Sequence, residues 1–371
     1  MNAIRKKIEK AMYSEEKGRF FSVEFFLFIA SAFYSVIVRI RGALYRLRIF
    51  KQKRLQCKVV SIGNIAVGGT GKTPMTIYLA KKLTKLGYKV VVISRGYKGK
   101  FEKKGGIISD GKEILTGPDF SGDEPFLMAA RLKDIPVVVG QNRYDAGLLA
   151  IKYFSPEVII LDDGFQHIKL FRDIDLLLLD SRHPFGNFHL IPRGILREPT
   201  ASIKRADALI LTRSSDNAEG RNTISAGSNN QPVFEARNTS YFFKVKKGGV
   251  SNKAPDFNNQ LSEDFGLFAE KQVVAFSGIA GNDHFRKTLY EFKCDLLEFI
   301  GFPDHHRYTA GDMERILKSV RDRRAEFVMT TEKDFARMDG KFNFPVDIIV
   351  VGVKMYLKDE KSFIEFILGK L

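Results

Sequence analysis

The amino-acid sequence predicts an α/β fold: a P-loop NTPase-like α/β/α sandwich domain, a second, smaller α/β domain, and a membrane-associated helix at the N-terminus. Three observations predict it. Short apolar runs alternate with helical stretches, a glycine-rich loop lies between the first run and a helix, and an aromatic, apolar segment precedes them. Apolar runs separated by helices are typical of a parallel sheet that is covered on both faces.

The length and composition suit two domains. At 371 residues and 44% hydrophobic content, the chain can bury two cores of ordinary size. Cys57 and Cys294 lie far apart in the sequence and fit neither a disulfide framework nor a zinc site, so we expect a reducing compartment. The net charge of +17 suits nucleic acid, an anionic membrane or a solvated surface.

The N-terminal region favours the membrane. Residues 20–38 contain six phenylalanines and are apolar apart from three serines and Glu24. Their length would just span a hydrocarbon core of about 30 Å, whereas the glutamate and serines favour a helix lying in the interface. The flank 39–58 carries eight basic residues and no acidic one, as expected beside anionic lipid. A buried core helix with a solvated flank is the alternative.

The glycine-rich loop 66–73 lies between the predicted strand 58–62 and a helix that Pro74 opens. Backbone N–H groups in such a loop converge on a phosphate, and the helix dipole adds positive potential there. Lys72 would reach the β- and γ-phosphates, and the Thr73 hydroxyl would ligate Mg²⁺. The expected nucleotide-binding residues are Val67, Gly68, Gly69, Thr70, Gly71, Lys72 and Thr73.

Three positions limit the class of nucleotide site. Ala66 occupies the position of the usual first glycine, so the loop requires an ordinary L-residue conformation there. Pro74 breaks the dinucleotide pattern Gly-x-Gly-x-x-Gly. Val67 stands where membrane-cycling ATPases of the ParA/MinD type carry an additional lysine, which argues against that class.

Six apolar runs predict the strands of the first domain. They cover residues 58–62, 89–93, 135–139, 158–161, 174–179 and 208–211. Polar residues follow most of these runs, and ligands of open parallel sheets bind beyond the carboxyl ends of the strands. We therefore expect the polar motifs to form one site.

A polar segment, 214–231, predicts a linker before the second domain. Beyond it, residues 233–245 predict a pair of extended segments. Further strands are expected at 273–276, 327–330 and 346–351, and helices at 283–292 and 310–323. The predicted division is 1–58 for the membrane-associated helix and its basic flank, 59–230 for the P-loop domain and 231–371 for the second domain.

Acidic residues at strand ends and turns are the main candidates for chemistry. Asp162 and Asp163 follow the strand 158–161, where a carboxylate holds Mg²⁺ directly or through water; the alternative is a helix N-cap. In the turn 122–125, Asp123 is either a cap or a general base for an acceptor hydroxyl.

Two further motifs remain open from the residues alone. The loop 192–199 holds Arg197 and Glu198, which suit either phosphate binding or a surface ion pair. The pair His305-His306 lacks zinc-ligand spacing, so one histidine either assists phosphoryl transfer from the second domain or is structural.

Seven segments resemble the tetraacyldisaccharide 4′-kinase family of lipid A biosynthesis. They are SIGNIAVGGTGKTP (61–74), SRGYKGK (94–100), GDEP (122–125), LDDGFQH (161–167), PRGILREP (192–199), FPDHH (302–306) and TEKD (331–334). Seven matches in the family's order are not expected by chance, and the aromatic, basic N-terminus is similar to the family's membrane-binding helix.

The resemblance implies an ATP- and Mg²⁺-dependent kinase that phosphorylates the 4′-hydroxyl of a tetraacylated glucosamine disaccharide 1-phosphate. It also implies two α/β/α domains joined by an extended two-stranded linker, with the site in the cleft between them. Asp123 would be the base and His305 its partner. Thr73, Asp162, Asp163 and Glu198 would serve Mg²⁺, while Arg143, Gln166, His167 and Arg197 would line the cleft.

The expected partners follow from the same reasoning. They are the lipid-linked disaccharide and the membrane surface, with no nucleic acid and with the chain as a monomer. The expected location is the cytoplasmic face of the inner membrane of a Gram-negative bacterium. The main rival is a membrane-associated P-loop NTPase that acts as a switch without a lipid acceptor; a nucleic-acid-binding ATPase and a non-catalytic nucleotide-binding module are weaker alternatives.

Overall fold

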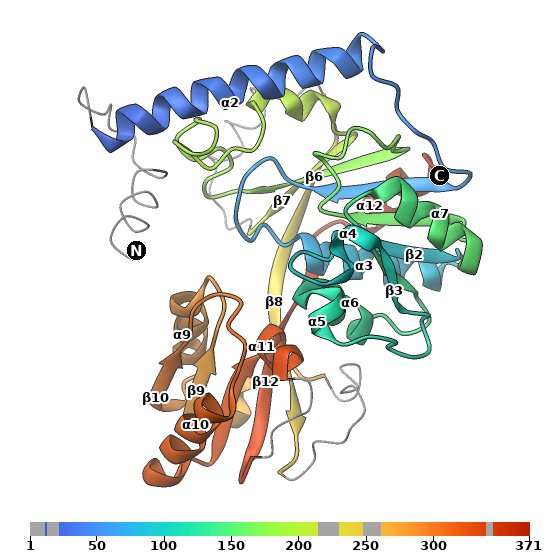
Figure 1. Ribbon diagram of the computed structural model, residues 1–371. Helices are drawn as coiled ribbons and strands as arrows, with labels where there is room; N and C mark the ends of the chain where they lie inside the picture. The colour runs from blue at the N-terminus through green and yellow to red at the C-terminus, as the bar shows by residue number, and fades with distance from the viewer. Residues whose placement is uncertain (1–11, 13–21, 214–229, 248–260, 339–343) are drawn as a thin grey trace.

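One continuous twelve-stranded sheet runs through the protein (Figure 1). The structure, a computed structural model, describes residues 12, 22–213, 230–247, 261–338 and 344–371. The strand order is β10-β9-β11-β12-β8-β7-β6-β1-β5-β2-β4-β3. Most of the predicted linker, and residues 20 and 21 of the apolar run, lie outside the described residues.

The P-loop lobe is the part of the sheet from β7 to β3 with the helices that cover it. Its strands are β1 (Lys58–Gly63), β2 (Val90–Ser94), β3 (Gly106–Ser109), β4 (Val137–Val139), β5 (Val158–Asp162), β6 (Ile174–Asp180) and β7 (Ala208–Thr212). Its helices are α3 (Lys72–Lys85), α4 (Phe101–Lys104), α5 (Pro118–Ser121), α6 (Asp123–Arg131), α7 (Arg143–Phe154) and the 3₁₀-helix η1 (Thr200–Arg205).

All six strands predicted for this lobe are present, and they pair in parallel as expected. Their carboxyl ends therefore meet at one edge, where β1 leads into the P-loop and β5 into Asp162. The short edge strand β3 was missed because its four residues, which pair antiparallel with β4, carry no distinct pattern.

The strands β8 (Val233–Val245) and β12 (Asp347–Leu357) connect the two halves of the sheet. The prediction of two extended segments in 233–245 was wrong: the run contains neither glycine nor proline, so it continues as a single strand. It pairs in parallel with β7 at its start and antiparallel with β12 from Ala236 to Val245. This pair descends from the P-loop lobe to the lower part of the molecule (Figure 1).

The C-terminal lobe is built around β9, β10 and β11 and the adjoining ends of β8 and β12. Its elements are η2 (Phe265–Phe268), β9 (Gln272–Ser277), α9 (Asn282–Glu291), β10 (Asp295–Gly301), α10 (Ala310–Arg323), β11 (Phe327–Thr331) and α11 (Glu332–Met338). The predicted helices at 283–292 and 310–323 are confirmed within one residue. Strand β10 was not predicted.

The chain ends by returning to the P-loop lobe. Helix α12 (Glu360–Leu368) buries Phe363 and Ile367 in the same core as Met75 and Leu79 of α3. The C-terminal helix thus covers the P-loop lobe although it follows the C-terminal lobe in sequence.

Helix α2 (Val23–Arg46) lies along the P-loop lobe as a long rod (Figure 1). Ser22 caps it by accepting a hydrogen bond from the Phe25 backbone N–H. On its inner face Ser31 donates to the Leu190 carbonyl at 2.9 Å, and Tyr34 to the Arg197 carbonyl at 3.1 Å. Its outer face carries exposed apolar side chains, among them Phe26, Phe33, Val36, Ile37 and Ile40.

Candidate active site

The P-loop is open toward solvent. Gly68 and Gly71 have φ of +119° and +87°, a region that favours glycine. A Cβ added at Gly68 or Gly69 would meet no atom within 4 Å. The loop then enters α3 at Lys72, so the exposed glycines 68 and 69 lie directly before a helix N-terminus, although the N–H groups of Val67 and Thr70 already donate to the Ile195 and Gly68 carbonyls.

Ala66 does not disturb the loop. It forms an antiparallel bridge with Leu196, and the neighbouring Val67 N–H donates to the Ile195 carbonyl at 2.7 Å. Its φ is not positive, so the position has no need of glycine. The first glycine of the usual motif is therefore replaced by an extended residue that pairs with the loop 192–199.

Two side chains outside the motif hold the loop. The Asn64 side-chain amide donates to the Thr70 hydroxyl at 3.0 Å, and the Arg213 guanidinium donates to the Gly69 carbonyl at 2.8 Å. Arg213 also pairs with Asp180 at the end of β6. Sequence reasoning missed Arg213 because it lies beyond β7, far from any recognisable motif.

Asp162 and Asp163 lie beside the loop in different environments. Asp162 is buried and accepts hydrogen bonds from Thr76 at 3.3 Å and Ser94 at 3.1 Å. Burial, followed by the nearby Glu124 and Asp163 charges, raises the pKa of Asp162 to about 6. The Asp162 carboxylate is thus the more readily protonated of the pair.

Asp163 faces the cations of the site. Its carboxylate lies 3.5 Å from Lys72 Nζ and 2.9 Å from Arg197 Nη1. Burial alone would raise the pKa of Asp163, but Lys72 and Arg197 hold it below the usual value. Lys72, Asp163 and Arg197 therefore form one charged group beside the open glycines.

The donor set at this edge fits Mg²⁺ better than a metal held by protein ligands alone. In the described part of the chain, no three His, Cys, Asp or Glu side chains gather as a metal site. Kinase Mg²⁺ typically uses one or two carboxylates and completes its shell with water and phosphate oxygens. Thr73, at the start of α3, and the two aspartates offer such a partial set.

The other sequence-predicted residues take more structural positions. Arg143, which is 3% exposed, donates to the Gly140 carbonyl at 2.6 Å and to the Asp162 carbonyl at 3.4 Å. The Gln166 amide donates to the Asn64 carbonyl at 2.7 Å. Both side chains thus donate to backbone carbonyls at or just after the carboxyl ends of strands.

His167 and Glu198 also face protein groups. Burial, followed by Arg143 and Arg172, lowers the pKa of His167 to about 4, and its buried Nε2 has no hydrogen-bond partner within the described part of the chain. Both carboxylate oxygens of Glu198 are engaged by Arg205, at 2.6 and 3.2 Å. The structure therefore pairs Glu198 with arginine and does not bring it into contact with Asp163.

A second centre joins the two lobes. Asp123, at the start of α6, lies 2.7 Å from Nδ1 of His305, which follows β10 in the C-terminal lobe. The neighbouring His306 instead contacts Asp312 at 3.0 Å and stacks on Phe302. Of the two candidate histidines, His305 is the one that reaches Asp123.

Helix α11 supplies two cations to the same place. Arg337 donates from Nε to Asp123 at 2.8 Å, and Lys333 lies 2.7 Å from Glu124. Lys333 most strongly, and Lys72 less so, lower the pKa of Glu124. The start of α6 thus lies between the P-loop and the C-terminal lobe. Sequence reasoning noted Lys333 without a role and missed Arg337.

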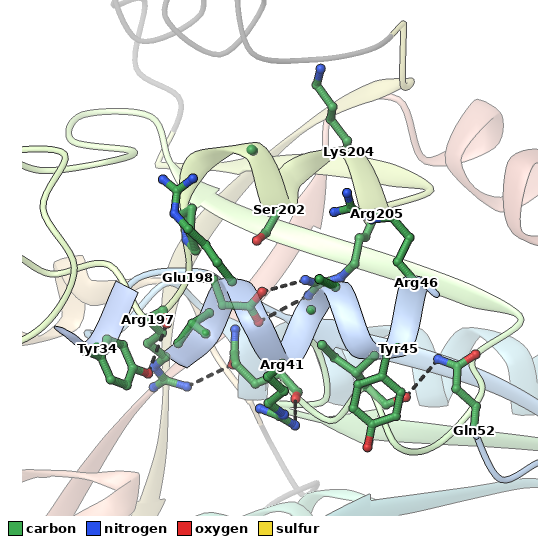
Figure 2. A pocket seen from close by; sticks show the side chains of 18 residues that line it. Tyr34, Arg41, Tyr45, Arg46, Gln52, Arg197, Glu198, Ser202, Lys204 and Arg205 are labelled. Atoms are coloured by element: carbon green, nitrogen blue, oxygen red, sulfur yellow. Dashed lines mark hydrogen bonds and ion pairs between the residues drawn. The ribbon is translucent and has the colours of Figure 1, made fainter. Parts of the chain in front are cut away.

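A cavity of about 820 Å³ lies between α2 and the segment 197–205 (Figure 2). Its lining includes the basic side chains of Arg39, Arg41, Arg46, Lys204 and Arg205. Arg197 and Glu198 line it as well, and Arg197 pairs with Asp163. Arg41 donates to the Gln166 carbonyl at 3.0 Å across this space. Arg197 therefore lines the cavity beside α2 and also contacts Asp163.

Comparison with known proteins decides among the readings of this site. The family model LpxK, tetraacyldisaccharide-1-P 4′-kinase, matches residues 23–371. This chain belongs to the tetraacyldisaccharide 4′-kinase family. It is 38% identical to the tetraacyldisaccharide 4′-kinase of Desulfatibacillum aliphaticivorans over 371 residues, covering all of this chain and 99% of that one.

Two more members of the family are similar over nearly the whole chain. The tetraacyldisaccharide 4′-kinase of Syntrophus aciditrophicus is 39% identical, over 92% of this chain and 91% of its own. The crystal structure of LpxK from Aquifex aeolicus, solved in complex with ATP, superposes with a TM-score of 0.74 at 32% identity. It covers 94% of this chain and 99% of that chain, which confirms the predicted α/β fold.

Proposed function

We propose that the protein transfers the γ-phosphate of ATP to the 4′-hydroxyl of a tetraacylated glucosamine disaccharide 1-phosphate. The observation that carries the proposal is the 2.7 Å contact between Asp123 and His305 in a chain of this family with an open P-loop. A nucleotide switch needs the loop alone. A kinase also needs a base for the acceptor hydroxyl, and Asp123 has the position and partner of one.

The P-loop lobe binds the nucleotide. Open glycines at 68 and 69 leave room for phosphate oxygens against the backbone N–H groups, and α3 adds its positive end. Lys72 and Arg197 then neutralise the charge that spreads over the transferred group. Thr73, Asp162 and Asp163 would hold Mg²⁺, which would supply further charge neutralisation at the phosphates.

The acceptor side performs the proton transfer. Asp123 accepts the proton of the 4′-hydroxyl as the sugar oxygen forms its bond to the γ-phosphorus, and the bond from that phosphorus to the bridging oxygen of ADP breaks. The products are the 4′-phosphorylated lipid and ADP. Because the transition state of such transfers is loose, the protein contributes mainly position and charge. His305 orients Asp123 for this role.

The predicted division near residue 230 serves this chemistry, although α12, which lies in the second segment 231–371, packs in the core of the P-loop lobe. Asp123 belongs to the P-loop lobe, and His305 to the C-terminal lobe. We propose that hinge movement about the strand pair β8 and β12 lets substrates enter and closes the site for transfer. The same interlobe angle with and without nucleotide and lipid would contradict this.

The lipid reaches the site along α2. Among the described helices, α2 alone is long and apolar enough to cross a membrane, with a mean hydropathy of 1.9 in its most apolar window. Its docking through Ser31 and Tyr34 leaves one apolar face exposed, which favours a helix lying in the interface at the cytoplasmic face of the inner membrane. The basic cavity beside it suits the 1-phosphate of the acceptor. We propose that the enzyme acts there as a monomer.

The decisive experiment combines the protein with Mg²⁺, γ-labelled ATP and the disaccharide 1-phosphate in detergent micelles. The label is expected in the lipid, with ADP formed in equal amount. ATP hydrolysis that proceeds without labelled lipid, at a rate unaffected by the acceptor, would favour the switch and reject the kinase.

A further inference from the structure

Arg337 lies at the joint between the lobes and is almost fully enclosed, with 4% of its side chain exposed. It extends from α11 and donates to acceptors on both sides of the joint. Its Nε reaches Asp123 Oδ2 at 2.8 Å, while Nη1 reaches the Gly278 carbonyl at 2.6 Å and Asp334 at 3.0 Å. A planar guanidinium with three such acceptors has little freedom to turn.

Asp334 fixes Arg337 from behind. The Asp334 side chain is fully buried and accepts hydrogen bonds from Thr331 at 2.6 Å, Tyr308 at 2.9 Å and the Gly278 N–H at 3.0 Å. Arg337 is thus set in place by the C-terminal lobe alone. Its Nε is presented to Asp123 by a framework that the P-loop lobe does not contribute to.

The two oxygens of Asp123 are used differently. His305 Nδ1 and Arg337 Nε both contact Oδ2, at 2.7 and 2.8 Å. Oδ1 has no hydrogen-bond partner among the residues that the structure describes. Arg337 Nη2 also lies 3.4 Å from His305 Nδ1, so the two partners hold Oδ2 together and the other oxygen of the carboxylate keeps a defined direction.

The charges around Asp123 favour its ionised form. Burial would raise its pKa, but Arg337, and after it His305, hold the pKa below the usual value. Asp334 and Asp304 stand behind these two partners, at 3.0 Å from Arg337 and 3.7 Å from His305. On α6 itself, the neighbouring Glu124 is neutralised by Lys333.

We propose that Arg337 is a positioning residue of the phosphoryl transfer, which holds Oδ2 of Asp123 from the C-terminal lobe and leaves Oδ1 ionised and directed at the acceptor hydroxyl. The inference rests on the proposed kinase activity. It differs from a purely structural interlobe ion pair, which would stabilise the protein without affecting how the rate depends on pH.

The test compares Arg337→Met and Arg337→Lys with the wild-type protein in the micelle assay from about pH 3 to pH 9, because the lowered pKa of Asp123 places the wild-type acid limb below pH 5. For Arg337→Met, kcat should fall about tenfold to a hundredfold through loss of orientation, with little change in KM. The acid limb of kcat should rise by about 1–3 pH units, because an opposite charge beside Asp123 has been removed. Arg337→Lys keeps the positive charge, so the acid limb of its kcat profile should stay at the wild-type pH.

A double-mutant cycle guards against a variant that is merely misfolded. In an Asp123→Asn background, Arg337→Met should lower kcat no further, because the carboxylate that it positions is gone. Arg321→Met, which breaks the exposed pair with Glu314 on α10, is the matched control and should behave as wild type.

The outcomes distinguish a failure of the proposed kinase activity from a failure of the role proposed for Arg337. If wild type labels no lipid, the proposed function fails. If wild type is active but Arg337→Met keeps the wild-type acid limb, or its effect adds fully to that of Asp123→Asn, Arg337 is structural and the inference is overturned.

Discussion

The phosphate end and the acceptor end of the site are built in opposite ways. Lys72, Asp163 and Arg197 all belong to the P-loop lobe and follow strands of one parallel sheet. Asp123, His305 and Arg337 come from two lobes, and Arg337 meets a carboxylate 214 residues away in the sequence. The residues of the first end all lie in one lobe, whereas those of the second come from two lobes.

This difference assigns separate tasks to the two ends. A site within one lobe binds nucleotide in any interlobe arrangement, because the loop, α3 and the strand ends move together. A base that is oriented across the joint is fully competent only when the lobes are close. The closure proposed above would limit the loss of phosphate to water while the acceptor is absent.

Asp123→Asn is expected to affect the acceptor end most strongly while sparing the phosphate end. Loss of the base should lower kcat at least about a hundredfold, the low end of what general bases contribute. The affinity for ATP should stay within about twofold, since Asp123, at the start of α6, is not part of the glycine-rich loop 67–73 or of α3. Turnover and equilibrium nucleotide binding measure the two effects. Near-normal turnover would remove Asp123 from the mechanism.

Lys72→Met is expected to affect the phosphate end of the site. Removing the cation 3.5 Å from Asp163 should lower kcat/KM for ATP by about 10²–10³, as for loss of one charge-stabilising donor. Lys85→Met, which changes an exposed lysine in the last turn of the same helix, is the matched control. Steady-state kinetics at varied ATP give the answer. An unchanged KM and kcat would show that phosphate binding does not depend on Lys72.

The phosphate end was predictable because its residues are contiguous or follow strands. The spacing of Gly71, Lys72 and Thr73, and the position of the two aspartates after an apolar run, carry the geometry in the local sequence. The role of Asn64 was not predicted, and Arg213 was missed because a positive-φ arginine beyond β7 carries no pattern.

The acceptor end was predictable only in part, and only through resemblance to a family. The pairing of Asp123 with His305 needs the register of two lobes, which no local periodicity contains. Arg337 is one of the 60 lysines and arginines of the chain and lies on a short helix, so its place between Asp123 and Asp334 follows from packing alone. The return of α12 to the P-loop core escaped for the same reason.

The third prediction concerns membrane binding, which we expect to depend on the outer face of α2 and not on the catalytic residues. Phe33 is 71% exposed on the outer face of α2, and burying such a side chain in lipid is worth about 1.5–3 kcal/mol. Phe33→Glu should therefore weaken binding to anionic vesicles at least about tenfold, while turnover on micellar substrate stays near wild type. Vesicle sedimentation measures the binding.

Leu267 of η2 provides the control for this prediction. It is 61% exposed in the C-terminal lobe, away from α2. Leu267→Glu should leave vesicle binding unchanged. Equal binding by the two variants and wild type would show that the apolar face of α2 is not the anchor.

The smallest expected effect concerns the stability of the P-loop lobe in acid. His167 is kept neutral by burial and by neighbouring arginines, with its pKa lowered to about 4. An unfolded histidine takes up a proton near pH 6.5. The stabilising contribution is therefore complete above that pH and is lost as the pH falls toward 4, by about 2 kcal/mol at pH 5.

His167→Gln removes this titration. Between pH 7.5 and pH 5, the free energy of unfolding should fall by about 2 kcal/mol less in the variant than in wild type, as measured by urea unfolding of the nucleotide-free protein. His183→Gln, at an exposed imidazole in the same lobe, should retain the wild-type loss. An equal loss in His167→Gln and wild type would mean that His167 is protonated in the folded protein. Its ring would then need an acidic partner in place of the arginines around it.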